Sequence, residues 1–155
     1  MILWRISNYA DLSGSGGLLH RGRWHNRGRP VVYLAESAAG ALLETLVHIE
    51  ASHPSELPHS YQLLEVDVPE AAKLLNVVEP LGDGWQQEPS ATRRIGDQWL
   101  AAQASLLLRV PSAVVGGRTF NVLMNPAHPQ AQTCRVVSVT RYPFDGRLRG
   151  SKGSP

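Results

Sequence analysis

Residues 22–48 read GRWHNRGRPVVYLAESAAGALLETLVH and pass from an arginine-rich stretch through an apolar segment into a helical pattern. The run PVVYLA at 30–35 begins at a proline and is rich in β-branched and aromatic residues, which predicts a strand. Ser37 is a suitable N-cap for a helix over 38–50, because apolar residues then recur on one broad face. The segment therefore places a basic loop, a strand and a helix in immediate succession.

Glu44 and His48 lie one turn apart on this predicted helix, outside the centre of its apolar face. A helical glutamate at such a position is commonly solvated. It can also point into a cleft beside the VVY strand. Helical periodicity does not choose between these two interpretations.

The rest of the chain predicts short strands and one further helix, which has Ser90 as its N-cap and runs to about residue 107. The strands are expected at 2–6, 61–69, 111–115, 120–126 and 134–140. Two helices are too few for regular βαβ alternation. We therefore expect an α+β fold, with a compact single domain over 1–146 and a small, mostly antiparallel split sheet. The tail over 147–155 is expected to be disordered.

The composition is that of one ordinary globular domain: 155 residues, 43% hydrophobic and 18% charged. The formal net charge is only +2, so the molecule as a whole does not require a polyanionic partner. Among its 15 basic residues only Lys73 and Lys152 are lysines. Arginine favours bidentate contacts to phosphates and carboxylates, although a GC-rich genome would produce the same bias.

The cysteine content and the absence of long apolar runs indicate in which cellular compartment the protein is expected. The single cysteine, Cys134, excludes an intramolecular disulfide and suits a reducing environment. The start, MILWRISNYA, is too short and too polar for a signal peptide, and no run is long enough to span a membrane. These features predict a cytoplasmic protein with no membrane partner.

Three kinds of catalytic or cofactor site are not indicated. The glycine-rich SGSGGLL at 13–19 has Leu19 where a dinucleotide-binding motif has its third glycine, so a mobile loop is the better interpretation. The six histidines show no metal-ligand spacing, so we expect no metal site. Ser13, Ser15 and Ser112 lie outside any nucleophile-elbow motif.

The basic segment RGRWHNRGR at 21–29 leaves three interpretations open. It can be a nucleic-acid patch in which Trp24 and His25 stack on bases. It can be an anion site in which arginines clamp a diphosphate. It can also be an exposed basic loop without a ligand, which composition alone favours.

Several motifs resemble those of the RES-domain toxins of bacterial type II toxin–antitoxin modules, over nearly the whole chain. They are LWRIS at 3–7, GRWH, GRPVVYLAES and ALLETLVH within 22–48, and LLLRVPSAVV and NVLMNPAHPQA within 106–131. The resemblance implies a fold similar to diphtheria-type ADP-ribosyltransferase toxins. It also implies an enzyme that arrests growth by degrading NAD⁺. NAD⁺ would be the substrate, cut at the nicotinamide–ribose bond by a glycohydrolase or phosphorylase reaction without a cofactor.

The same resemblance implies the site residues. The catalytic set is Glu44, Arg23 and Tyr33; the NAD⁺-binding set is Arg5, Arg23, Tyr33, Ser112 and, less strongly, Asn125 at the cleft edge. Glu44 would stabilise an oxocarbenium-like ribose, and the arginines would bind the diphosphate or nicotinamide-ribose region. Tyr33 would stack on the ligand, and Ser112 would hold a ribose hydroxyl or Glu44 itself.

The partner implied by the resemblance is an Xre-family helix-turn-helix antitoxin that covers the active site in a hetero-oligomer. DNA would be contacted only through that antitoxin. Two other activities stay open: transfer of ADP-ribose to a cellular protein and, in a different class, nucleic-acid binding. The acceptor, water or phosphate, is also open.

Overall fold

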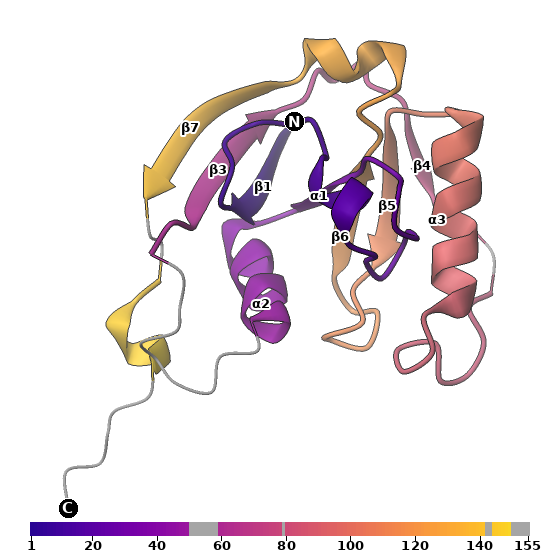
Figure 1. The fold of residues 1–155 in the computed structure, drawn as a ribbon, viewed down its shortest axis with the longest axis horizontal. Coiled ribbons are helices and arrows are strands. Elements are labelled where there is room, and N and C mark those ends of the chain that lie inside the picture. Colours follow the sequence, from indigo (N-terminus) through magenta and orange to yellow (C-terminus); the bar gives the residue numbers. More distant parts are fainter. Residues whose placement is uncertain (50–58, 79, 142–143, 150–155) are drawn as a thin grey trace, which may run out of the picture.

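The computed structural model describes residues 1–49, 59–78, 80–141 and 144–149, and a seven-stranded sheet forms its centre (Figure 1). The strands are β1 (Ile2–Ser7), β2 (Val32–Ala35), β3 (Gln62–Asp67), β4 (Leu74–Asn76), β5 (Leu107–Pro111), β6 (Phe120–Met124) and β7 (Arg135–Arg141). Their order is β4-β5-β6-β2-β1-β3-β7, with β4 and β5 parallel and the other neighbours antiparallel. The predicted α+β class with a mostly antiparallel sheet is confirmed.

The two halves of the sheet meet between β1 and β2, where Trp4 pairs with Ala35. On one side β1 is paired with β3 from Ile2–Asp67 to Ser7–Gln62. On the other side β2 is paired with β6 along its full length. Helix α2 (Ala38–His48) packs against both β1 and β2, so it lies at this narrow junction.

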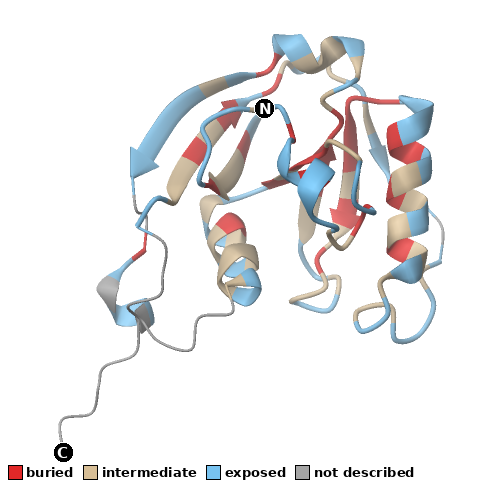
Figure 2. Cartoon of the chain, in the orientation of Figure 1, coloured by how far each residue is buried: buried red, intermediate tan, exposed pale blue. Residues whose placement is uncertain are grey.

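Hydrophobic residues are buried on both faces of the sheet. One cluster consists of Leu3, Val32, Leu34, Leu64, Val66, Leu107, Val122, Met124 and their neighbours. The other lies beside helix α3 (Ser90–Ala102) and consists of Trp24, Val31, Trp99, Leu100, Leu108, Val110 and Leu123. Because side chains alternate along a strand, β5 and β6 contribute to both clusters. Figure 2 shows this burial in the central strands and on the inner side of α3, whereas β7 is mostly exposed.

Helix α2 begins where the sequence predicts. Ser37 is extended, with φ −144° and ψ 156°, and its hydroxyl accepts a hydrogen bond from the Gly40 N–H at 3.0 Å. This cap satisfies one of the backbone donors that a helix leaves free at its first turn. The cap therefore fixes the start of the helix that carries Glu44.

Helix α3 is shorter than predicted, and this shifts the next strand. The helix ends at Ala102 because Gln103 adopts a left-handed conformation with φ 49°. Leu106, expected on the helix, is instead fully buried just before β5. The strand predicted at 111–115 is wrong: β5 ends at Pro111, and residues 113–117 form a turn. Ser90 is the first helical residue rather than the cap, which is Pro89.

The glycine-rich segment is a packed part of the fold rather than a free loop. It contains one helical turn, α1 (Gly16–Leu19). The Gly14 carbonyl accepts hydrogen bonds from Gly17 and Val31, and the Gly17 carbonyl accepts from Gly28 and Arg29. A Cβ on Gly17 would lie 2.1 Å from the Arg29 carbonyl oxygen, so the two segments touch without room for a side chain.

The described residues also form two short 3-10 helices. One, η2 (Pro129–Thr133), precedes β7, and the other, η3 (Gly146–Arg149), follows it. The first residues of the expected disordered tail, 147–149, therefore lie in η3. Residues 150–155 are outside the described part of the chain.

Close contact between α3 and the basic segment predicts a strong effect of Gly96→Ala. The added Cβ would lie 1.7 Å from the Trp24 carbonyl oxygen, a backbone atom that cannot move independently of its loop. We expect a loss of about 1–3 kcal/mol in the free energy of unfolding, measured by urea denaturation. The control is Gly16→Ala, where no atom lies within 4 Å of the new Cβ. Equal stability of the two variants would contradict this packing.

Candidate functional site

A cleft of about 700 Å³ opens where the sheet halves meet. Its walls come from β1, β2 and α2, from the basic segment at 22–24, and from the segments around 86–87 and 111–114. The lining residues are Trp4, Arg5, Ile6, Gly22, Arg23, Trp24, Tyr33, Leu34, Ala35, Ala41, Glu44, Thr45, Val47, His48, Tyr61, Gln86, Gln87, Pro111, Ala113, Val114 and Asn121. Four of the predicted site residues, each from a different element or loop, therefore share one cleft: Arg5, Arg23, Tyr33 and Glu44.

Arg5 brings a positive charge to the cleft from β1. One of its guanidinium nitrogens, Nη1, donates to the Asp11 carbonyl oxygen at 2.8 Å, which orients the side chain. Burial lowers the pKa of Arg5 from its ordinary value, and the nearby Asp11 carboxylate partly offsets this effect. An arginine that loses hydration in this way gains from an anionic ligand.

Arg23 brings the second cation and is held by two different segments. Its Nη1 donates to the Trp85 carbonyl oxygen at 3.0 Å, and its own carbonyl accepts from the Thr92 hydroxyl at 2.6 Å. The preceding residue is held as well, because the Gly22 carbonyl accepts from Arg93 Nε at 2.8 Å. Helix α3 therefore fixes the backbone from which Arg23 enters the cleft.

The far end of the basic segment is also tied to α3. Asp97 accepts from the backbone N–H and the side-chain amide of Asn26, at 3.0 and 2.7 Å. The same carboxylate lies 3.1 Å from Arg29 Nε. Arginines of the segment thus differ in role: Arg23 reaches the cleft, whereas Arg29 forms an ion pair with the helix.

Tyr33 lines the cleft from β2, and its hydroxyl is bonded to the basic segment. The hydroxyl accepts from the Trp24 N–H at 3.0 Å and lies 2.8 Å from His25 Nδ1. Burial raises the pKa of Tyr33, so the phenol stays protonated. The ring is therefore available to a ligand, while the hydroxyl already has two partners.

Glu44 points to Ser112, and this contact links α2 to the end of β5. The Ser112 hydroxyl donates to Glu44 Oε1 at 2.5 Å. The hydroxyl oxygen also accepts from the Val114 N–H at 3.2 Å, and Ser112 is only 2% exposed. Ser112 was predicted to hold either a ribose hydroxyl or Glu44. The structure shows the contact with Glu44.

Asn125 is not brought into the cleft. It is 1% exposed, and its side-chain amide donates to the Leu100 carbonyl at 3.0 Å. Its side-chain oxygen accepts from the Ala127 N–H. These bonds connect the end of β6 to α3, so the structure gives Asn125 an architectural position rather than the expected place at the cleft edge.

Several lining residues were not expected from the sequence. Gln86, Gln87 and Asn121 add amide side chains, and Tyr61 adds a further aromatic ring. Phe144 packs edge-on against Tyr61, with 6.1 Å between ring centroids. No periodic pattern marks these residues, since they lie in loops or near strand ends that meet only in three dimensions.

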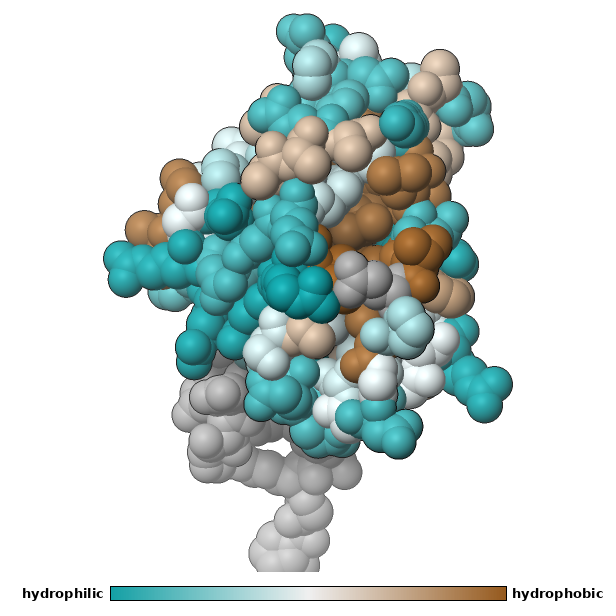
Figure 3. Space-filling view, turned by 90° about the vertical axis from the view of Figure 1, so that its right-hand side faces the viewer, coloured by the Kyte–Doolittle hydropathy of each residue, from teal (hydrophilic) through white to brown (hydrophobic). Residues whose placement is uncertain are grey.

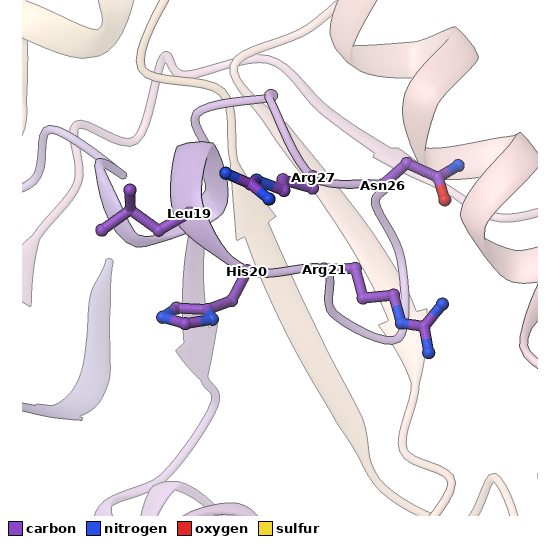
Figure 4. A pocket seen from close by; sticks show the side chains of 5 residues that line it. All are labelled: Leu19, His20, Arg21, Asn26 and Arg27. Carbon is purple, nitrogen blue, oxygen red and sulfur yellow. The ribbon is translucent and has the colours of Figure 1, made fainter.

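A second, shallower depression lies on the outer side of the basic segment. Leu19, His20, Arg21, Asn26 and Arg27 line it. Figure 4 shows that the side chains of Arg21 and Arg27 project from the loop in different directions and do not converge on one point. The depression lacks the enclosing walls and the carboxylate of the main cleft.

Metal and thiol chemistry find no support in the described residues. Within 1–49, 59–78, 80–141 and 144–149, no three His, Cys, Asp or Glu side chains are grouped to hold a metal ion. Cys134 is buried in the core, and burial raises the pKa of its thiol. Nor, within those residues, is any helix long and apolar enough to cross a membrane.

The fold and cleft define a class of protein. A small α+β domain presents two arginines, aromatic rings and one serine-bonded glutamate in a common cavity. This set suits an anionic ligand with flat rings, held near a carboxylate that can stabilise positive charge. The class is that of small α+β domains with a cleft able to bind such a ligand.

Comparison with known proteins gives the family. The RES domain matches residues 2–145, and the chain belongs to the RES-domain family. It is 47% identical to Toxin Res of Pseudomonas putida over 148 residues, covering 96% of this chain and 99% of that protein. It is 38% identical to the Prs ADP-ribosylating toxin of Sphingobium sp., covering 94% of each.

A solved structure shares the fold. The match is to the crystal structure of the M. tuberculosis MbcT–MbcA toxin–antitoxin complex, with a TM-score of 0.61 and 18% sequence identity. It covers 90% of this chain and 82% of the matched chain. The family resemblance noted from the motifs is confirmed by the RES-domain match, and the fold is shared with a chain of that complex.

Burial of His25 behind Tyr33 predicts a pH dependence of stability. Burial lowers the pKa of His25, so the unfolded chain binds this proton more readily than the folded chain does. Stability should therefore fall as pH drops below about 6.5, with a slope of at most about 1.4 kcal/mol per pH unit from this group. Urea denaturation between pH 7.5 and 5.5 measures this loss of stability. A His25→Asn variant should lose less stability over this range; an unchanged slope would contradict the assignment.

Proposed function

We propose that this chain is the toxin of a toxin–antitoxin module and that it degrades NAD⁺ by cleaving the nicotinamide–ribose bond. The observation that supports this most directly is the meeting of Arg5, Arg23, Tyr33 and Glu44 in one cleft, with Ser112 bonded to Glu44. NAD⁺ supplies the matching chemistry: a diphosphate for arginines, flat rings for aromatic side chains, and a bond whose cleavage leaves positive charge on ribose. In this proposal NAD⁺ is the substrate, and no cofactor takes part.

The proposed reaction needs no base to expel the leaving group. The bond between ribose C1′ and the nicotinamide nitrogen breaks, and its electron pair stays on nicotinamide, which leaves neutral. C1′ becomes oxocarbenium-like, and the Glu44 carboxylate stabilises that charge. Water or phosphate then bonds to C1′; water must lose a proton in doing so, which Glu44 can accept.

The arginines and Tyr33 have binding roles in this proposal. Arg5 and Arg23 hold the diphosphate or the nicotinamide-ribose region by charge-assisted hydrogen bonds. The Tyr33 ring contacts the nicotinamide or its ribose by stacking. Ser112 acts through Glu44, because its hydroxyl already has a donor and an acceptor partner within the protein.

Transfer of ADP-ribose to a protein is the second candidate. The relative named Prs ADP-ribosylating toxin, 38% identical to this chain, favours it. The same cleft and the same C1′ chemistry serve both reactions, and only the acceptor differs. Labelled NAD⁺ separates them: transfer leaves the label on a macromolecule, whereas degradation releases free ADP-ribose or its phosphate.

An antitoxin is the proposed partner. The structural neighbour is one chain of a toxin–antitoxin complex, which supports a neutralising protein for this chain as well. We propose an Xre-family antitoxin that covers the cleft in a cytoplasmic hetero-oligomer and makes the DNA contacts itself. A complex that binds NAD⁺ as readily as the free chain would contradict this arrangement.

Direct nucleic-acid binding has less support. In the basic segment, Arg23 is bonded to the Trp85 carbonyl and Arg29 is paired with Asp97. The aromatic residues proposed for base stacking, Trp24 and His25, are 2% and 4% exposed. A base cannot stack on side chains that the protein covers.

Glu44→Gln tests the proposed catalyst. The amide keeps the size of the side chain and removes its charge, so we expect NAD⁺ turnover to fall at least about a hundredfold while the fold is retained. The measurement is NAD⁺ loss by purified protein free of antitoxin. Glu70→Gln is the matched control, because Glu70 is 86% exposed and lies outside the cleft. Full turnover by Glu44→Gln would remove Glu44 from the mechanism.

Ser112→Ala tests whether the serine acts through Glu44. Loss of the 2.5 Å hydrogen bond frees the carboxylate to leave its position, so kcat should fall about tenfold or more with little change in KM. Steady-state kinetics give both constants. A rise in KM at constant kcat would instead indicate that Ser112 binds the substrate directly.

A further inference from the structure

His25 is a buried titratable residue that the proposed reaction does not use. It is 4% exposed and does not line the cleft, yet it directly contacts Tyr33, which does. The two rings are 5.6 Å apart between centroids and tilted by 53°. The contact therefore joins a residue outside the cleft to one of its walls.

Hydrogen-bond directions in this region form one consistent chain. His25 Nε2 lies 3.0 Å from the His20 carbonyl oxygen, which can only accept, so Nε2 carries a proton. The Trp24 N–H donates to the Tyr33 hydroxyl oxygen at 3.0 Å. The remaining bond, 2.8 Å between Tyr33 Oη and His25 Nδ1, is then made by the phenol proton. In a neutral imidazole protonated at Nε2, Nδ1 is the acceptor that this bond needs.

The space around this bond is closed. A Cβ added to Gly22 would lie 2.6 Å from Tyr33 Oη and 2.8 Å from His25 Nδ1. Gly22 is itself held, since its N–H donates to the His25 carbonyl and its carbonyl accepts from Arg93 Nε. The basic segment therefore passes so close to both rings that residue 22 has no room for a side chain.

We propose that His25 is a positioning residue for the cleft: it accepts a hydrogen bond from the Tyr33 hydroxyl and so holds the Tyr33 ring in place as a cleft wall. This inference rests on the proposed function, because the ring is useful only if a ligand stacks on it. His25 touches no substrate in this proposal and acts through Tyr33 alone.

The arrangement works only while His25 is neutral. A second proton on Nδ1 would oppose the phenol proton, so the phenol could no longer donate this hydrogen bond. Two charged groups on α3, Asp97 and Arg93, lie near His25. A third, Arg23, lies near Tyr33 and belongs to the same basic segment as His25. Asp97 is bonded to Asn26 and paired with Arg29, and Arg93 is bonded to Gly22. Burial is the largest influence and favours the neutral ring.

Kinetics of three variants test the positioning role. His25→Leu removes the acceptor and should lower kcat for NAD⁺ about tenfold or more at pH 7.5. His25→Asn places an amide oxygen close to the position of Nδ1 and should recover most of that loss. The double variant His25→Leu/Tyr33→Phe should be no slower than the slower single variant, because both break the same bond. Additive losses, or full activity of His25→Leu, would overturn the proposal.

A pH profile separates positioning from general destabilisation. Wild-type kcat should fall as pH drops through the range in which His25 gains its second proton, and His25→Asn should lack this fall. His20→Gln is the control, because its side chain is exposed and its carbonyl remains. Thermal denaturation of each variant confirms that the assay temperature lies below unfolding. The same low-pH fall in His25→Asn as in wild type would contradict the proposal.

A structural measurement keeps this test independent of the proposed function. In protein labelled with ¹⁵N-histidine, imidazole nitrogen shifts report the tautomer of His25, assigned by comparison with His25→Asn. Neutral His25 protonated at Nε2 at pH 7.5 is the expected result. A ring protonated at Nδ1, or at both nitrogens, overturns the proposal even if NAD⁺ is consumed. If the tautomer is as expected but NAD⁺ is not consumed, the proposed function is rejected, and with it any catalytic role of His25. The hydrogen bond between Tyr33 and His25 would still be confirmed.

Discussion

The attachment of the basic segment to helix α3 is the constraint on which the cleft depends. Thr92 and Arg93 bond to the carbonyls of Arg23 and Gly22, and Gly96 leaves room for the Trp24 carbonyl. Without these contacts the segment would be an exposed loop with four arginines. With them, one arginine enters the cleft and Trp24 becomes part of the core. Local sequence does not encode this arrangement, since the helix lies some 70 residues further on.

The opposite wall depends on a second long-range contact. Glu44 comes from α2 and Ser112 follows β5, and their hydrogen bond joins the helix that packs on β1 and β2 to the end of β5. A carboxylate beside a buried serine keeps a defined position without a metal or a covalent partner. Figure 3 shows the side of the molecule that carries α3 and β4, where hydrophilic side chains cover much of the surface and apolar side chains gather in one part. Leu75 in β4 and Val78 just after it are exposed apolar residues.

Sequence patterns predicted part of this fold well. β1, β2, α2 and β3 were expected close to their observed places, because a proline, a serine cap and apolar runs mark them. The end of α3 was missed because AAQASLLL continues a helical pattern, while a left-handed Gln103 stops the helix. That error moved the predicted strand from 107–111 to 111–115. β4 was missed because three residues carry too little periodicity to be recognised.

The site residues were harder to predict from the sequence than the fold was. Helical periodicity did not decide whether Glu44 faces solvent or a cleft, and composition favoured a basic loop without a ligand. Arg5, Arg23, Tyr33 and Ser112 were identified by the family motifs and not by local sequence patterns. Asn125 came from the same motifs, yet it is held by α3 outside the cleft. His25 was considered only as a stacking residue, because nothing in the sequence reveals that it is buried against Tyr33.

The most direct test of this account is nicotinamide release from NAD⁺ by the purified, antitoxin-free chain, with and without added phosphate. The account predicts one nicotinamide per NAD⁺ lost, together with ADP-ribose or its 1″-phosphate according to the acceptor. Folded protein that binds NAD⁺ but releases no nicotinamide under either condition would contradict it.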